Sequence, residues 1–215
     1  SMFSTEENLE YLFKHLKYYF PETTIPRVIG LINNVDYQSK TIYADSLLLI
    51  SLDTYLGVDH YLYEGIPQYI RQEMDITFLP SHVASKFAES KIPPSNDRSF
   101  LSQMIYHGKQ VYLKDWVLPR SSDAEKMLYT EQQIQWVIDN EAYMWQYIVE
   151  KQLLYNTDPS LSNRFIEPAP FSKFYLEIDN ESPGRIGVWI GWQIIKSYMK
   201  RYPDTEISAL LNLPA

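Results

Sequence analysis

The chain has 215 residues, of which 45% are hydrophobic and 21% are charged, a balance typical of a globular protein with a substantial core. Its net charge of −8 argues against non-specific nucleic-acid binding, which requires clustered Lys and Arg. The absence of Cys excludes disulfides, thiolate nucleophiles and zinc sites built on Cys. No apolar run approaches the roughly 18 residues that a membrane-spanning helix needs.

The chain opens with the pattern of an amphipathic helix. Apolar side chains recur at helical spacing from Leu9 to Phe20, Thr5 is the expected N-cap, and Pro21 ends the pattern. We therefore expect an N-terminal helix within residues 1–24.

Short apolar runs follow this helix. Residues 26–32, 41–43 and 47–52 are apolar or β-branched, and the segments between them carry the Asn, Gln and Ser that are typical of turns. These runs predict a small sheet of roughly two to four strands within residues 25–55.

Residues 65–215 carry apolar residues at helical spacing, so this part is expected to be mainly helical. The most regular pattern begins with Thr130 and Gln133, which form a capping box, and it predicts one helix of about six turns. Because the sheet precedes the helices, the sequence predicts a single α+β domain over residues 1–215. It is predominantly helical, with the small N-terminal sheet packed on a helical bundle.

Short helices are predicted at residues 67–74 and 81–89, broken by Pro80 and by Pro93-Pro94. Residues 100–113 belong to a longer helix that Pro119 ends, and a last short helix is predicted at 205–211. Residues 155–183 contain several Pro and predict a long ordered loop or a set of turns.

The run 186–199 is apolar nearly all round and predicts a buried helix. Gly187 and Gly191 lie four residues apart on it and would allow another backbone to approach closely.

An acidic and aromatic segment follows the last predicted strand. Asp53, Tyr55, Asp59 and His60 lie close together in the sequence. Two carboxylates and an imidazole can hold a hard cation or act as an acid–base pair. The same side chains can instead cap a turn through its backbone groups, and both interpretations remain open at this point.

Glu141 lies beside the apolar stripe of the helix that begins after Thr130. A carboxylate in this position is either partly buried with a raised pKa or paired with a basic side chain. The candidate partners are Arg164, Lys173, Arg185 and Lys196.

The four histidines form no recognisable zinc motif. None is followed by a second His four residues later, so H-E-x-x-H is absent. Glycine-rich phosphate loops and the G-x-S-x-G nucleophile motif are also absent. We therefore assign no metal site and no cofactor.

Six short segments, taken in order, carry a resemblance to a known family. They are the stretches around Leu52 to His60, Met104 to Lys109, Glu141 to Trp145, Leu154-Tyr155, Pro170 to Phe174 and Gly187 to Ile194. In this order and spacing they resemble the gliding motility-associated lipoprotein GldB family of Bacteroidetes, over nearly the whole chain. The resemblance implies a lipid-anchored, periplasm-facing protein of the cell envelope, whose signal and anchor Cys precede this sequence. It also implies partners among the envelope proteins of the gliding or secretion machinery.

This family is similar, more distantly, to zinc-dependent proteases of the gluzincin type, which implies a zincin-like fold. In that comparison the segment around His107 takes the place of the metal-binding helix, and Glu141 that of the third ligand. Two frames fill the ligand, base and ligand positions: Gln103, Met104 and His107, or Ile105, Tyr106 and Lys109. Neither frame can hold zinc as the parent site does, because Met and Tyr cannot serve as the carboxylate base and Gln, Ile or Lys is no substitute for imidazole.

The resemblance and the missing motif together imply a degenerate, non-catalytic module that acts through protein partners. In place of the metal, we expect the Lys109 ammonium to pair with Glu141. The candidate binding residues are Asp53, Tyr55, Asp59, His60, Lys109, Trp145, Lys173 and Arg185.

Two alternatives remain open. The first is an enzyme: a hydrolase that uses His107, Glu141 and Tyr106, or a metal-dependent enzyme with unusual ligands among Asp53, Asp59 and His60. The second is a peptide- or glycan-binding domain with an aromatic cleft lined by Trp136, Trp145, Trp189 and Trp192.

Overall fold

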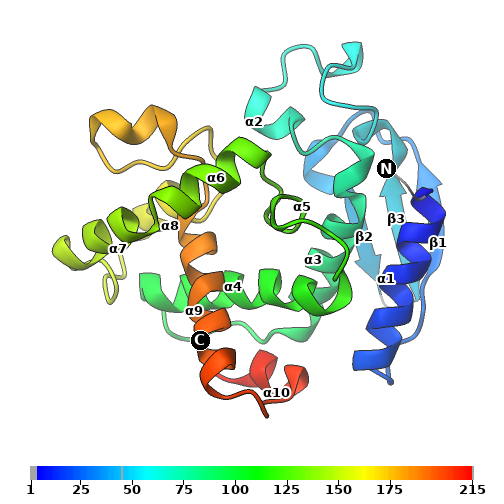
Figure 1. Ribbon diagram of the computed structural model, residues 1–215. Coiled ribbons are helices and arrows are strands. Elements are labelled where there is room, and N and C mark those ends of the chain that lie inside the picture. Colours follow the sequence, from blue (N-terminus) through cyan, green and yellow to red (C-terminus); the bar gives the residue numbers. More distant parts are fainter. Residues whose placement is uncertain (1–3, 45, 215) are drawn as a thin grey trace. The chain divides into compact units, whose positions relative to one another are not determined.

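A computed structural model describes residues 4–44 and 46–214, and this part of the chain is α+β and mainly helical, as predicted (Figure 1). The strands are β1 (Arg27–Leu31), β2 (Thr41–Ala44) and β3 (Leu47–Ser51). The helices are α1 (Thr5–Tyr19), α2 (Gln68–Arg71), α3 (Leu79–Lys91), α4 (Phe100–Val117), α5 (Asp123–Met127), α6 (Glu131–Asp139), α7 (Glu141–Glu150), α8 (Ser160–Phe165), α9 (Ile186–Arg201) and α10 (Ile207–Asn212). Within the described residues, no helix is long and apolar enough to cross a membrane.

The chain divides into two compact units. Unit 1 consists of Ser1–Ser90 and Leu113–Leu128, and unit 2 consists of Lys91–Tyr112 and Tyr129–Ala215. Helix α4 therefore contributes its longer, N-terminal part to unit 2 and its last residues to unit 1. The single-domain organisation expected from the sequence stays a prediction.

The small sheet lies in unit 1, and its described strands have the order β1-β3-β2 (Figure 1). Strand β3 runs parallel to β1 and antiparallel to β2. Leu48 and Ile50 of β3 are buried. Phe87 of α3 packs against Tyr43 of β2 and against Phe20 at the end of α1, so this face of the sheet adjoins the helices.

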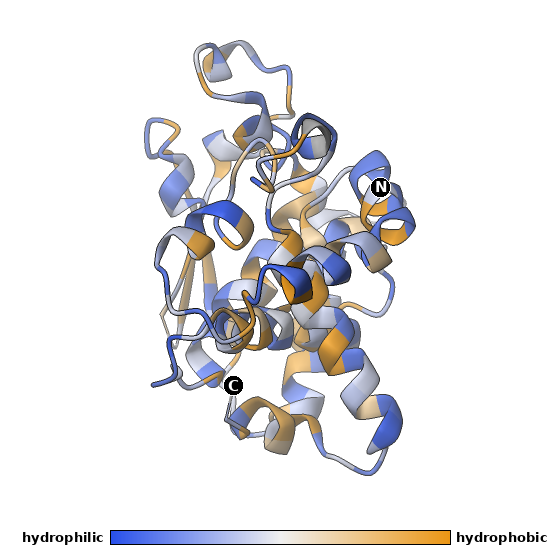
Figure 2. Ribbon diagram, turned by 90° about the vertical axis from the view of Figure 1, so that its left-hand side faces the viewer, coloured by the Kyte–Doolittle hydropathy of each residue, from blue (hydrophilic) through white to orange (hydrophobic). Residues whose placement is uncertain are grey.

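Helix α1 begins at Thr5, the residue expected to be its N-cap, and therefore one residue earlier than expected. Ser4, not Thr5, is the N-cap, and it forms a reciprocal capping box with Glu7. This arrangement satisfies two backbone N–H groups that the first turn leaves without a partner. The buried residues of α1 are Leu9, Leu12, Phe13 and Leu16, and near the N-terminus the colouring by hydropathy shows hydrophobic and hydrophilic residues on the same helix (Figure 2).

The long helix predicted after Thr130 is interrupted, so that prediction is wrong in its length. Asn140 ends α6 and precedes α7, with backbone angles outside the helical range. Its side-chain amide donates a 2.9 Å hydrogen bond to the Trp136 carbonyl oxygen. An Asn side chain competes in this way for helix carbonyl groups and favours a break.

Two smaller predictions are also corrected. Pro80 does not separate helices but lies in the first turn of α3, where its missing N–H costs nothing. The segment 155–183 is not one loop, because it contains α8 and a short 3-10 helix at Glu177–Glu181.

The close backbone approach predicted at Gly187 and Gly191 is confirmed. A Cβ atom built on Gly191 would overlap the Met104 carbonyl group of α4, and one on Gly108 would overlap the backbone of Gly191. At Gly187, the Phe165 carbonyl oxygen would lie 2.9 Å away. Helices α4 and α9 of unit 2 therefore cross where neither has a side chain.

Candidate functional site

The candidate residues from the sequence are divided between the two units. Asp53, Tyr55, Asp59 and His60 belong to unit 1. Unit 2 contains Tyr106, His107, Lys109, Glu141, Trp145, Lys173 and Arg185.

Asp53 serves the turn that follows β1. Its carboxylate is 7% exposed and accepts hydrogen bonds from the backbone N–H groups of Asn33, at 3.2 Å, and Val35, at 2.8 Å. Asn34 and Val35 both adopt positive φ angles of 58°. The carboxylate therefore holds a turn in an unfavourable backbone conformation, which is the structural one of the two interpretations.

Asp59 and His60 do not join Asp53 in a cation site. Asp59 is exposed, and the Nδ1 atom of His60 accepts a 3.4 Å hydrogen bond from the Leu62 N–H at the start of a short 3-10 helix. Within residues 4–44 and 46–214, no group of three His, Asp or Glu side chains is placed to hold a metal ion.

The expected pairing of Lys109 with Glu141 is wrong. The Lys109 ammonium donates to the Leu213 carbonyl oxygen at 2.5 Å, and burial lowers the Lys109 pKa. The Glu141 carboxylate accepts a 3.2 Å hydrogen bond from the indole N–H of Trp189 on α9. A neutral donor thus satisfies Glu141, so its position requires neither a cation nor a metal.

The other basic candidates have partners of different kinds. Arg164 donates to the Tyr147 hydroxyl at 3.0 Å and to the Lys173 carbonyl oxygen at 2.8 Å. Lys196 lies 3.5 Å from the ring centre of Trp192, and Arg185 lies 5.5 Å from that of Tyr129. The Lys173 side chain is exposed.

Tyr106 and His107 are half-buried neighbours on α4, with ring centres 5.1 Å apart in an edge-to-face arrangement. Trp145 on α7 is also half-buried. These residues keep their candidate status, with no geometry that selects a reaction.

The aromatic cleft proposed from four tryptophans is not present as expected. Trp189 and Trp192 are buried in the core of unit 2, where their rings pack edge to face at 5.5 Å. Only Trp136 and Trp145 of that set retain partial exposure. Rings that form the core cannot also line a ligand cleft.

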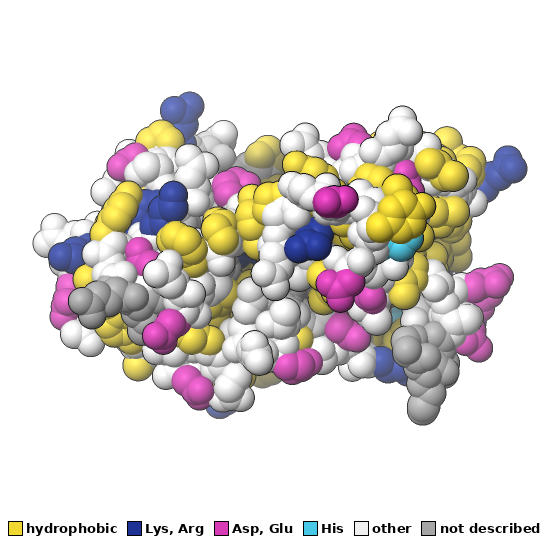
Figure 3. Space-filling model, turned by 90° about the horizontal axis from the view of Figure 1, so that it is seen from above, with side chains coloured by type: hydrophobic (Ala, Val, Ile, Leu, Met, Phe, Trp, Pro, Cys, Tyr) yellow, Lys and Arg dark blue, Asp and Glu magenta, His cyan; other side chains and the backbone are white. Residues whose placement is uncertain are grey.

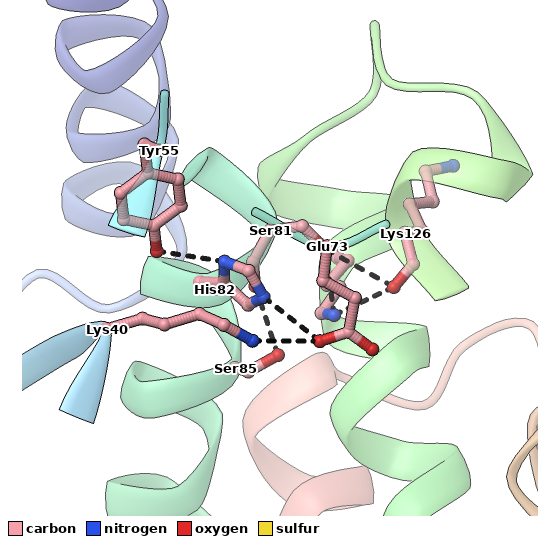
Figure 4. Close-up of polar contacts among 8 residues, drawn as sticks. Lys40, Tyr55, Glu73, Ser81, His82, Ser85 and Lys126 are labelled. Carbon is pink, nitrogen blue, oxygen red and sulfur yellow. Dashed lines mark hydrogen bonds and ion pairs between the residues drawn. The ribbon is translucent and has the colours of Figure 1, made fainter. Parts of the chain in front are cut away.

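The most concentrated polar arrangement of unit 1 was missed in the sequence. The Tyr55 hydroxyl lies 2.9 Å from Nδ1 of His82, and Nε2 of His82 lies 3.6 Å from the Glu73 carboxylate (Figure 4). Glu73 in turn forms a 3.2 Å ion pair with Lys40. Tyr55 was predicted as a binding residue, but its partners were not.

A second set of buried contacts in unit 1 involves lysines. Lys114 donates to the Ser81 hydroxyl at 2.9 Å and to the Lys126 carbonyl oxygen at 2.7 Å. The Lys126 ammonium pairs with Asp115 at 2.9 Å. We call Lys40, Tyr55, Glu73, Ser81, His82, Lys114 and Lys126 the buried polar cluster.

Electrostatics keeps the centre of this cluster neutral. Burial lowers the pKa of His82 to about 4, and the attraction of Glu73 offsets only part of that effect. Burial, together with the negative charge of Glu73, raises the pKa of Tyr55. His82 and Tyr55 are therefore both uncharged at neutral pH, whereas Glu73, Lys40 and Lys114 contribute charge near His82.

The cluster resembles catalytic chemistry but lacks access to a substrate. A Ser next to a Lys, and a Tyr next to a His, are combinations that enzymes use for nucleophilic or acid–base steps. Here Ser81 is 1% exposed and Lys114 is 3% exposed. Lys114 also donates to Ser81, so it is no base for that hydroxyl. The burial of these residues fits a polar core better than an active site, even though Nε2 of His82 has no hydrogen-bond partner in the described part of the chain.

On the face shown in Figure 3, acidic and basic side chains are interspersed with hydrophobic ones, and the coloured atoms form no extended basic area. This distribution agrees with the exclusion of non-specific nucleic-acid binding.

A model of the family described as gliding motility protein GldB matches residues 1–215, the whole chain. No curated protein matches the chain, and no solved structure matches it. The zincin-like part of the expectation therefore stays a prediction.

Proposed function

Because this chain belongs to the gliding motility protein GldB family, we propose that it is a non-catalytic module of the cell envelope that acts in gliding by binding other proteins. The family match supports the involvement in gliding motility. The non-catalytic role, the envelope partners and the lipid anchor are the proposed parts. The sequence contains no Cys, so in this proposal the lipidated Cys precedes Ser1.

The observation that supports a non-catalytic role most directly is that the candidate catalytic carboxylates accept hydrogen bonds within the fold. Asp53 holds the turn after β1, and Glu141 accepts from Trp189. A carboxylate that already accepts hydrogen bonds from the fold is less available to activate water or hold a metal. The buried Tyr55 and His82 lead to the same interpretation, because a substrate cannot reach them.

The proposal is tested by complementation of a gliding bacterium that lacks its own copy of the gene. The full chain, with its natural leader, carries Tyr106→Phe, His107→Gln and Glu141→Gln together. These replacements remove the proposed chemistry and keep side-chain volume. We expect cell movement at the level restored by the unchanged protein.

Two results would contradict the proposal. One is loss of movement with the triple variant although it is folded, abundant and correctly localised. The other is stoichiometric zinc in purified protein that is lost with Glu141→Gln alone. A Gly191→Val variant, which cannot pack α9 on α4, shows that the movement assay responds to loss of the protein.

A further inference from the structure

Strand β1 is an edge strand that lacks the usual protection. It borders β3 on one side only, and its residues are exposed apart from the half-buried Leu31. Val28 is 42% exposed and Ile29 is 36% exposed, although their side chains point to opposite faces of the sheet. Natural edge strands are commonly protected by charges, Pro or bulges. The only charge on β1 is that of Arg27.

The ladder with β3 shows which backbone groups of β1 point outward. The Arg27 N–H donates to the Ser46 carbonyl oxygen at 2.8 Å, in the parallel register that pairs Arg27 with Leu47. In a parallel ladder the N–H and C=O of one residue point to the same side, and successive residues alternate. Val28 and Gly30 therefore direct both backbone groups away from β3. Within the described residues, neither has a hydrogen bond on that side.

The outer face of the sheet extends this edge with apolar side chains. The register places Ile29, Leu49 and Ile42 side by side across the three strands. Ile42 is 47% exposed, and Leu47 beside Arg27 is 39% exposed. Leu48 and Ile50, which alternate with these residues on β3, lie in the core. The face that carries Ile29 and Ile42 is thus the solvent-facing side of the sheet, and its exposed side chains are apolar apart from Arg27.

We propose that the open edge of β1 binds an extended segment of a partner protein, which adds a fourth strand to the sheet. The partner strand pairs its backbone with the outward groups of Val28 and Gly30, and its alternate apolar side chains continue the row that ends at Ile29. An acidic residue of the partner strand lies beside Arg27. This inference rests on the proposed function, because it specifies the kind of protein partner.

The positive charge of Arg27 on this edge favours a different protein, and not a second copy of this chain, as the binding partner. In the described part of the chain, the Arg27 guanidinium has no ion pair. Strand β1 has no acidic residue, so β1 paired with itself leaves Arg27 without a counter-charge. Two copies that each carry a net charge of −8 also repel one another.

A single substitution can block the binding of a partner strand to β1 without disrupting the folded sheet. Val28→Pro removes the outward N–H of this residue but leaves all hydrogen bonds between β1 and β3 in place. Pro is tolerated at such edge positions. Val28→Thr is the matched control, because it keeps the N–H and the β-branched shape. A second pair of variants changes only the side chain of Arg27. Arg27→Glu reverses its charge, and Arg27→Lys, the control, keeps it.

The first measurement uses a defined probe on the full chain: a short peptide of alternating Val and Thr with one Glu. We expect it to shift the amide resonances of Val28 and Gly30 and to slow their hydrogen exchange at least ~10-fold. Val28→Pro and Arg27→Glu should each weaken binding at least ~10-fold, and both controls should bind like wild type. Amide shifts elsewhere, or equal binding by Val28→Pro, would overturn the inference.

The second measurement is movement of the complemented strain. Val28→Pro and Arg27→Glu should abolish or strongly reduce gliding, whereas Val28→Thr and Arg27→Lys should restore it. If circular dichroism shows that the Val28→Pro variant is unfolded, the comparison of Arg27→Glu with Arg27→Lys decides the outcome. Normal gliding with Arg27→Glu overturns the edge inference but leaves the proposed function intact, because that function is contradicted by other results: loss of movement with the triple variant, or stoichiometric zinc that Glu141→Gln removes. A dimer of the purified chain that Val28→Pro converts to monomer also overturns the inference, since the occupant is then a second copy.

Discussion

The two units fill their interiors in different ways. The buried residues of unit 1 include Asp53, Glu73, His82, Lys114 and Lys126. In unit 2, Lys109 is the only described residue of charged type that is buried, and the core consists mainly of aromatic and aliphatic side chains. Unit 1 therefore depends on satisfied polar contacts, and unit 2 depends on the fit between helices. Stability should respond to pH and to loss of hydrogen bonds in the first unit, and to changes of volume in the second.

The largest effect is expected where α4 and α9 cross in unit 2. Gly191→Ala places a methyl group against the Met104 carbonyl, which is rigid backbone that cannot move aside. We expect the free energy of unfolding to fall by about 3 kcal/mol or more, measured by urea denaturation. Ser197→Ala, on the exposed side of the same helix, should change it by less than ~0.5 kcal/mol. A Gly191→Ala protein as stable as wild type would show that the crossing is loosely packed.

Acid should weaken unit 1 through His82. The folded pKa is about 4, against 6.5 for an unperturbed His, so between these values the unfolded chain binds a proton that the folded chain does not. The free energy of unfolding should therefore fall as pH is lowered from 6.5 towards 4, by up to roughly 3 kcal/mol. His82→Gln should flatten this dependence. An equal slope in wild type and His82→Gln would contradict the assignment.

The turn after β1 should respond next. Asp53→Ala leaves the N–H groups of Asn33 and Val35 without their acceptor, which should cost about 2 kcal/mol of unfolding free energy. The exposed Asp59→Ala is the matched control, with a change below ~0.5 kcal/mol. If Asp53→Ala and Asp59→Ala lost similar amounts of unfolding free energy, the two carboxylates would be binding a common ligand, and Asp53 would not be a local cap.

The smallest effect is expected at Glu141 in unit 2. Glu141→Gln keeps an oxygen acceptor for the Trp189 indole and should be close to neutral. Glu141→Ala leaves that buried N–H without a partner and should lose about 1 kcal/mol. The same urea titrations measure both variants. If Glu141→Gln were as damaging as Glu141→Ala, the negative charge itself would be required and the contact with Trp189 would not explain the residue.

The fold could be predicted from the sequence wherever a pattern extends over several turns. The strands, the N-terminal helix and the buried helix at 186–201 were visible in their apolar spacing. The break at Asn140 was not, because the apolar pattern continues through it and only the side-chain bond to the Trp136 carbonyl marks the end of α6. A one-residue capping contact of this kind leaves little trace in periodicity.

The candidate sites were harder to predict, because their contacts join distant parts of the chain. Tyr55 and His82 are separated by 27 residues, and Lys40 and Glu73 by 33. No spacing rule connects such positions. The pairing of Lys109 with Glu141 failed for a related reason: the ammonium meets Leu213, 104 residues away, near the end of the chain. Only Asp53 carried a local signal, since a carboxylate that directly follows a strand often caps a turn.

The path of the chain through the two units sets the order in which they can form on the ribosome. Residues of unit 1 lie on both sides of the segment 91–112, which belongs to unit 2. A nascent chain released before residue 126 lacks Lys126, so its N-terminal portion cannot yet assemble the complete buried polar cluster. Residues 91–112 have been synthesised by then, but α9 has not. Their packing is therefore incomplete, because α9 contributes Gly191 to the crossing with α4. Neither unit can therefore finish folding as an early, self-contained product of translation, in contrast to proteins whose domains follow one another along the chain.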